Sequence, residues 1–188
     1  MSMNTKPTKG FTLIETLVAI AILTISMGAP FYAVEQSITA ADASRDELTA
    51  SALAQEGVEY VHSVRDDNYL YVRNNPLSTQ SWLYGVDGTI SNGVTSPNCF
   101  APNNQCTVDP TTSVGNQVQS YATIARLFLS ASYLYNQQSN GSATFFTRSV
   151  QLTNISAKEV KVTVTVKWTT RNTPYVTTIT EYLDNWLP

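Results

Sequence analysis

The chain begins with a long apolar stretch. Between Glu15 and Glu35, nineteen consecutive residues carry no charge, and Thr16, Thr24 and Ser26 supply the polar side chains among them. As a helix this stretch would measure about 28 Å, close to the roughly 30 Å hydrocarbon core of a bilayer. The pattern predicts a helix long enough to cross a membrane.

A second helical pattern follows with small and apolar residues three and four positions apart: Ala50, Leu53, Ala54, Gly57, Tyr60, Val61 and Val64. This spacing is typical of an amphipathic helix with one packed face. The pattern ends at about Asp67, so we expect helix over residues 11–66, about 84 Å if continuous.

The last third of the chain alternates with a period of two. Apolar residues at 160, 162, 164, 166 and 168 are separated by Lys and Thr, which predicts a strand with one buried and one solvated face. We predict further strands at Tyr121–Leu129, Thr144–Leu152 and Tyr175–Leu183, with a turn at Arg171-Asn172-Thr173-Pro174. Four strands joined by short turns favour an antiparallel sheet covered by the amphipathic helix.

Residues 68–120 are dense in turn-forming residues and predict a long variable loop region. Within it we expect one short hairpin, Ser81–Val86 turning at Asp87-Gly88 toward Thr89–Ile90. Four aromatic residues would pin this hairpin to the sheet or helix, or would form an exposed adhesive patch: Tyr69, Tyr71, Trp82 and Tyr84.

Composition narrows the function. Only 13% of residues are charged, the net charge is −3, and basic residues form no cluster, which argues against a nucleic-acid partner. The hydrophobic content of 43% is ordinary for a globular chain and excludes acidic disorder. Polarity comes mainly from Ser, Thr, Asn and Gln, which make up 66 of the 188 residues.

The charges that flank the apolar stretch give it an orientation. Lys6 and Lys9 precede it and mainly acidic residues follow, so the positive-inside rule places the amino terminus in the cytoplasm and the rest outside. A cleaved secretory signal or a plain membrane anchor would both have this layout. Neither explains Glu15, because a carboxylate in an apolar segment is costly at membrane depth.

The run Lys9-Gly10-Phe11-Thr12-Leu13-Ile14-Glu15 resembles the processing site of type IV prepilins and pseudopilins. That family has a short basic leader ending in Gly, followed by Phe, with Glu as the fifth residue of the mature chain. The resemblance implies that prepilin peptidase cuts between Gly10 and Phe11 and methylates the new amino terminus of Phe11.

Glu15 then has a physical role. Cleavage creates a cationic amine on Phe11, and an apolar environment favours pairing of that charge with a carboxylate of a neighbouring subunit. Such head-to-tail contacts build open filaments. Because Gly28 and Pro30 weaken a helix, we also expect a kink or a locally melted stretch there within the filament.

The expected fold class is α+β and pilin-like, with a long amino-terminal helix packed on a carboxyl-terminal antiparallel sheet of about four strands. The expected parts are a leader (1–10), a transmembrane and filament-core helix (11–35), an amphipathic spine (36–67), a variable loop region (68–120) and the sheet (121–188). The segment at residues 54–67 also resembles minor pilins and pseudopilins more than major pilins.

Little else in the chain carries chemistry. Cys99 and Cys106 would lie outside the cytoplasm, where a disulfide is favoured over free thiols. His62 is the lone histidine and is expected to be a packed or surface helical residue, and Asp66-Asp67 is interpreted as a helix end rather than a Ca²⁺ site. We therefore expect no catalytic residues, no metal and no cofactor.

The sequence thus predicts a structural subunit of a type IV pilus or related filament, a minor pilin or pseudopilin, and not an enzyme. Its expected partners are prepilin peptidase, other pilin subunits, the inner-membrane assembly machinery, and lipid before assembly, with no nucleic acid. It would be a single-pass membrane protein first and an extracellular or periplasmic filament subunit afterwards. The alternative is a filament-tip adhesin whose 68–120 region binds a surface or ligand.

Overall fold

The fold is seen in a computed structural model that describes residues 10–91, 94–100, 104–112, 117–121, 126–139 and 141–186. The chain divides into two units, Met1–Arg45 and Asp46–Pro188. Residues 1–9 of the predicted leader, with Lys6 and Lys9, lie outside the described part of the chain.

One helix, α1 (Leu13–Asn74), contributes residues to both units. In the second unit its inward face is the predicted stripe, and the buried residues are Ala50, Leu53, Ala54, Gly57, Val58, Val61, Arg65 and Asn68. The predicted end at Asp67 is wrong, because α1 runs on to Asn74. The stop signal is Pro76, which disfavours helical geometry at the residue before it.

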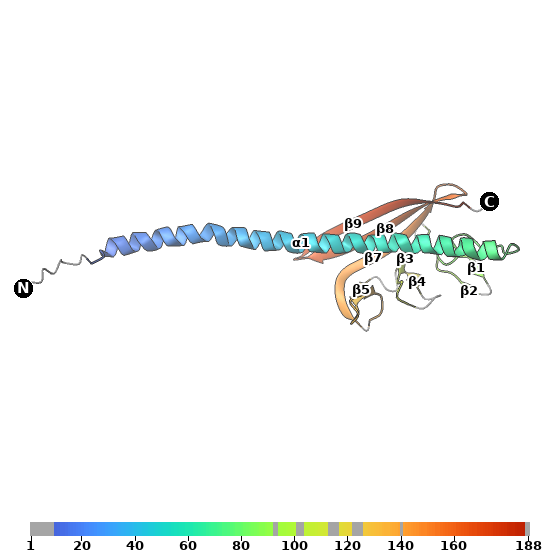
Figure 1. Cartoon of the computed structure of the whole chain (residues 1–188), viewed down its shortest axis with the longest axis horizontal. Helices are drawn as coiled ribbons and strands as arrows, with labels where there is room; N and C mark the ends of the chain where they lie inside the picture. The colour runs from blue at the N-terminus through green and yellow to red at the C-terminus, as the bar shows by residue number, and fades with distance from the viewer. Residues whose placement is uncertain are drawn as a thin grey trace, which may run out of the picture. The chain divides into compact units, whose positions relative to one another are not determined.

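In the described part of the chain the main sheet has seven antiparallel strands rather than about four. Its strands are β3 (Cys106–Val108), β4 (Val118–Ser120), β5 (Arg126–Leu129), β6 (Tyr135–Asn136), β7 (Ser142–Asn154), β8 (Glu159–Thr170) and β9 (Thr173–Asp184). The long β7 pairs with β8 on one side and with both β3 and β5 on the other. Figure 1 shows the carboxyl half of α1 alongside β7, β8 and β9. The α+β class predicted from the sequence is confirmed.

The three long strands are those that the sequence predicted, and the fourth is shorter. The expected strand Tyr121–Leu129 is β5 from Arg126 onward, and residues 122–125 lie outside the described chain. In β8 the alternation is confirmed, since Val160, Val162, Val164, Val166 and Trp168 are all buried.

The turn between β8 and β9 has a defined geometry. Arg171 and Asn172 have φ of 49° and 68°, the left-handed pair of a two-residue type I′ hairpin turn. The turn sets the register in which Trp168 stands opposite Tyr175, and their rings stack with centroids 5.5 Å apart.

The helix and sheet approach closely at Gly57. A Cβ atom there would lie 2.8 Å from Cγ1 of Val164, which is closer than real Cβ contacts. The packing of α1 on β8 therefore favours glycine here, because any larger residue would displace Val164. The surrounding core consists mainly of Val and Leu side chains.

The predicted hairpin in the middle region is wrong. Residues 82–86 form turns, and the hairpin instead joins β1 (Ile90–Ser91) to β2 (Val94–Thr95). The reason lies in Asn68 of α1, whose Nδ2 donates to the carbonyl oxygens of Trp82 and Tyr84 at 3.3 and 2.9 Å. Those carbonyls are thus held by the helix and not by a partner strand.

The region expected to be loop also contributes to the main sheet through β3 and β4. Cys99 and Cys106 form a disulfide with Cα atoms 5.1 Å apart, and both are fully buried. The backbone N–H of Leu152 in β7 donates to the carbonyl of Cys99 at 2.8 Å, which ties the disulfide loop to the sheet.

Candidate processing and assembly site

The residues around the predicted cleavage point precede the first helical turn. Gly10 and Phe11 are exposed, and Phe11 has 82% of its surface accessible. Gly10 has no other atom within 4 Å of where a side chain would begin. Within the described chain nothing covers this peptide bond, so the geometry leaves it open to a peptidase.

The helix begins with its own cap. The backbone N–H of Glu15 points to the hydroxyl and the carbonyl of Thr12, at 3.3 and 3.1 Å, and the N–H of Thr16 donates to the same carbonyl at 3.2 Å. Thr12 is therefore the N-cap, and Glu15 stands three residues later, the spacing of a capping box. An acidic residue in the first turn also interacts favourably with the helix dipole.

Glu15 has no ion-pair partner among the described residues of its own chain. Its side chain is exposed on the first turn of the apolar segment. This arrangement leaves the carboxylate available to a cation from another molecule. Sequence reasoning did not identify Thr12 as the N-cap, although the spacing Thr12-Leu13-Ile14-Glu15 carries that signal.

The hydroxyl groups in the apolar segment are satisfied within the helix. Thr16, Thr24 and Ser26 each donate to a backbone carbonyl one turn earlier, at 2.9, 2.9 and 3.0 Å. Such bonds remove the cost of placing a hydroxyl in hydrocarbon. The three polar residues are therefore compatible with a membrane environment.

Around the polar groups the helix presents a wide apolar surface made of Leu13, Ile14, Leu17, Val18, Ile20, Ile22, Leu23, Ile25, Met27, Phe31, Tyr32 and Val34, all at least half exposed. In the described chain, α1 is the one helix long and apolar enough to cross a membrane, with a mean hydropathy of 2.0 in its most apolar window. None of that window is buried by the rest of the chain. The segment fits a membrane-anchored protein.

Gly28 and Pro30 lie inside α1 without interrupting it. Pro30 has no backbone N–H, so the carbonyl of Ser26 lacks its usual helical donor. A shallow apolar groove of about 270 Å³ lies on this face and is lined by Ser26, Met27, Pro30, Phe31 and Val34. The predicted kink concerns the filament and stays a prediction.

His62 forms part of the contact between α1 and β9. Its Nε2 atom lies 3.1 Å from Oε1 of Glu181, and its Nδ1 lies 3.3 Å from Nη2 of Arg65. The guanidinium of Arg65 in turn covers the ring of Trp186 at 3.9 Å. Within the described residues no cluster of His, Cys, Asp or Glu could hold a metal ion.

The four aromatic residues of the middle region do not form one exposed patch. Trp82 packs against the core, and Tyr69 contacts Trp186 edge to face with centroids 6.3 Å apart. Tyr84 lines a hollow in the second unit, and Tyr71 is 46% exposed. Trp82 and Tyr69 are thus packed, the Tyr84 side chain lines the hollow, and Tyr71 is exposed.

Sequence reasoning missed a buried cation. Arg148 of β7 is fully buried and donates through Nη1 to the carbonyl of Leu53 at 2.9 Å and to the carboxylate of Glu56. Its Nη2 donates to the carbonyl of Val108 at 2.6 Å. The signal was a charged residue at an inward position of a strand, which requires an acidic partner. Glu56 supplies it from the helix.

No curated protein and no solved structure matched the chain. Residues 5–29 match the family model described as the prokaryotic N-terminal methylation motif, and this range contains Gly10, Phe11 and Glu15. The motif implies processing by prepilin peptidase and assembly with other pilins. The chain therefore carries the amino-terminal signature of type IV pilins, and with its apolar helix it fits a membrane-anchored, pilin-like prepilin.

Proposed function

We propose that the protein is a minor pilin or pseudopilin, a subunit of a type IV pilus or related filament. Prepilin peptidase cuts it after Gly10, Phe11 is methylated, and residues 11–35 pass from the membrane into the filament. The observation that supports this most is Glu15, an exposed carboxylate without a partner in the described chain, one turn from the matched cleavage site.

The amine on Phe11 of one subunit would pair with Glu15 of its neighbour. In an apolar filament core an unpaired charge is expensive, so this pairing would fix the axial step between subunits. The head, residues 36–188, would then face the outside of the cell, and a disulfide between Cys99 and Cys106 suits that oxidising compartment. The role is assembly and not catalysis.

The choice of a minor subunit or pseudopilin rests on the resemblance of residues 54–67. In the structure this segment packs α1 on the sheet. Glu56 forms an ion pair with Arg148, and Gly57 allows β8 to approach the helix closely. Deleting the gene for this chain, and measuring its share of sheared filaments in the parent cells, tests the choice; a chain that makes up most of the fibre would contradict it. A minor subunit is expected to be scarce in the fibre and required for its initiation.

Processing and assembly are tested separately in cells that express a prepilin peptidase. Gly10→Ala is expected to leave the full-length precursor, whereas the natural chain gives a mature protein that starts at Phe11 and carries one extra methyl group by mass spectrometry. Normal processing of Gly10→Ala would contradict the proposed cleavage site.

For assembly, Glu15→Gln is expected to be cleaved but excluded from sheared filaments. Glu35→Gln is the matched control, because Glu35 lies at the other end of the apolar stretch and is expected to assemble normally. Incorporation of both variants at equal levels would contradict the role proposed for Glu15.

A further inference from the structure

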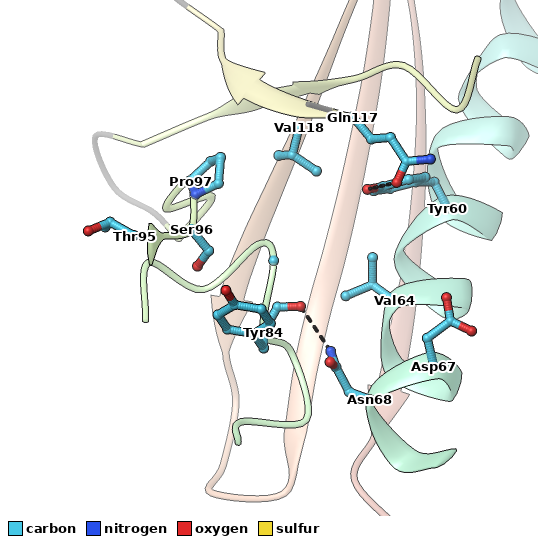
Figure 2. Close-up of a pocket in the computed structure, with 11 residues that line it drawn as sticks. Tyr60, Val64, Asp67, Asn68, Tyr84, Thr95, Ser96, Pro97, Gln117 and Val118 are labelled. Carbon is cyan, nitrogen blue, oxygen red and sulfur yellow. Dashed lines mark hydrogen bonds between the residues drawn. The ribbon is translucent and has the colours of Figure 1, made fainter. Parts of the chain in front are cut away.

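A hollow of about 250 Å³ lies in the second unit, beside α1 (Figure 2). Four separate segments of the chain supply its walls: Tyr60, Val64, Asp67 and Asn68 from α1, Tyr84 and Gly85 from the turns, Thr95, Ser96 and Pro97 after the β1–β2 turn, and Gln117 and Val118 at β4. The processing and assembly site uses none of these residues.

The hollow is held open by the chain itself. Asn68 is buried, and besides binding the carbonyls of Trp82 and Tyr84 it accepts a bond from Nε2 of Gln80 at 2.6 Å. Gly85 has φ of 108°, and a Cβ atom there would meet only Val64, at 3.9 Å. The missing side chain leaves space, and the positive φ restricts the position to glycine.

The walls combine apolar surfaces with polar groups that have no partner among the described residues. The hydroxyl of Tyr60 donates to Oε1 of Gln117 at 3.3 Å, as the dashed line in Figure 2 shows. The amide N–H groups of Gln117 and the hydroxyl of Tyr84 make no hydrogen bond with described residues. A ligand would therefore meet a free amide donor and a free hydroxyl.

The charge of the hollow excludes acidic ligands. Asp67 is exposed and is the one ionised side chain among the residues that line it. Burial, together with the nearby charge of Asp67, raises the pKa of Tyr60 to about 12, so the phenol stays neutral at physiological pH. An anion would find one negative charge and no cation.

We propose that this hollow binds one ring of a neutral saccharide. The rings of Tyr60 and Tyr84 and the apolar side chains of Val64, Pro97 and Val118 provide surfaces for the C–H faces of a sugar ring.

Sugar hydroxyls both donate and accept, which matches the amide donor of Gln117 and the carboxylate acceptor of Asp67. The volume is that of about eight water molecules, which suits a single ring. This inference goes beyond filament assembly and does not depend on it.

The test uses the full-length chain in a detergent without a sugar head group. Methyl glycosides of glucose, galactose, mannose and N-acetylglucosamine are titrated, and binding is followed by saturation-transfer NMR. At least one glycoside is expected to give weak, saturable binding. Gln117→Leu and Asp67→Ala should each weaken it at least tenfold, because each removes a hydrogen-bonding partner of the sugar.

Glu59→Ala is the matched control. Glu59 is an exposed carboxylate on the same helix outside the hollow, and its loss should leave binding unchanged. Tyr84→Phe removes only a hydroxyl, so it should weaken binding without affecting the fold. Thermal melts of every variant separate loss of binding from loss of structure.

Three results would overturn the proposal. One is the absence of saturable binding by all four glycosides. Another is binding that Gln117→Leu and Asp67→Ala do not change. The third is binding of tetramethylammonium, lost in Asp67→Ala, without binding of any glycoside, because aromatic rings beside a carboxylate also suit a cation.

Discussion

The contact between Arg148 and Glu56 offers a sharp test of how the helix is held on the sheet. Arg148 is fully buried, whereas the side chain of Glu56 is 38% exposed. Arg148→Met keeps most of the apolar stem and removes three donated hydrogen bonds, to Glu56, Leu53 and Val108. The substitution thus isolates the polar part of the contact from its packing.

The expected cost follows from the partners that remain. The carbonyl of Val108 keeps a second donor, Nε2 of Gln137 at 3.1 Å, so losing its bond to Arg148 costs little free energy. Nε of Arg148 has no partner among the described residues, and methionine removes that cost. At about 1 kcal/mol for each of the other two lost bonds, less the relief at Nε, we expect Arg148→Met to lower the free energy of unfolding by about 1–2 kcal/mol.

Glu56→Gln leaves a buried guanidinium with a weaker partner. Removing one member of a fully buried pair costs about 3–5 kcal/mol, and the exposure of Glu56 to water reduces this to about 1–2 kcal/mol. The double variant should cost little more than Arg148→Met alone, because no cation is left unpaired. The coupling energy would then be about 1–2 kcal/mol.

The assay is thermal unfolding of the detergent-solubilised chain, with the disulfide intact, followed by tryptophan fluorescence. Arg148→Met should lower Tm by roughly 2–8 °C, taking about 2–4 °C per kcal/mol for a domain of this size. Arg126→Met is the control, since Arg126 is exposed on β5 and should change stability by less than about 0.5 kcal/mol. Two results would refute the reasoning. One is an equal Tm for Arg148→Met and Arg126→Met. The other is a cost in the double variant that equals the sum of the costs of Arg148→Met and Glu56→Gln.

Three further predictions concern the second unit. Gly57→Ala should lower the free energy of unfolding of the second unit by about 1–2 kcal/mol, because the new Cβ meets Val164, although alanine has the better helix propensity. Urea unfolding measures this cost. The control Gly28→Ala should show no loss of stability, because a Cβ at Gly28 would lie in open space. The raised pKa of Tyr60 means that the folded state favours the neutral phenol. The stabilisation from Tyr60 should therefore be fully present below about pH 10 and be lost as the pH rises toward 12. Tyr60→Phe should reduce this loss of stability, and an identical loss in both proteins would contradict the raised pKa of Tyr60. Reduction of the disulfide between Cys99 and Cys106 should lower the free energy of unfolding by about 2–3 kcal/mol without unfolding the long strands, measured by circular dichroism with and without reductant.

The parts of the fold that the sequence predicted are those in which a local pattern repeats many times. The alternation over β8 gives five consecutive inward residues, and the spacing along α1 gives the buried stripe from Ala50 to Val61. By contrast, β1, β2 and β6 are two residues long and β3 and β4 are three, too short for a period to be visible. The estimate of about four strands was low for that reason.

The wrong hairpin prediction and the missed ion pair of Arg148 have the same physical origin. Each depends on side-chain hydrogen bonds between residues far apart in the chain. Residues 82–86 have the aromatic content of a strand, but the side chain of Asn68 takes two of their carbonyls. Arg148 has its partner 92 positions away, on a different element. Local spacing cannot show such pairings, because each depends on where the helix lies once it has packed on the sheet.

The predicted processing site rests on a signal that is local in the chain and lies within the matched motif at residues 5–29. The geometry adds that cleavage after Gly10 would remove no residue that the helix needs, since the cap is Thr12 and the first turn begins at Leu13. Thr12 can therefore cap the helix, with Glu15 in its first turn, both before and after cleavage. What cleavage changes is the charge of the neighbouring terminus, because a neutral peptide at Phe11 becomes a cationic amine. In the proposed filament, that change supplies the cation that Glu15 lacks in its own described chain, so cleavage would control assembly through charge with the fold of the helix unchanged.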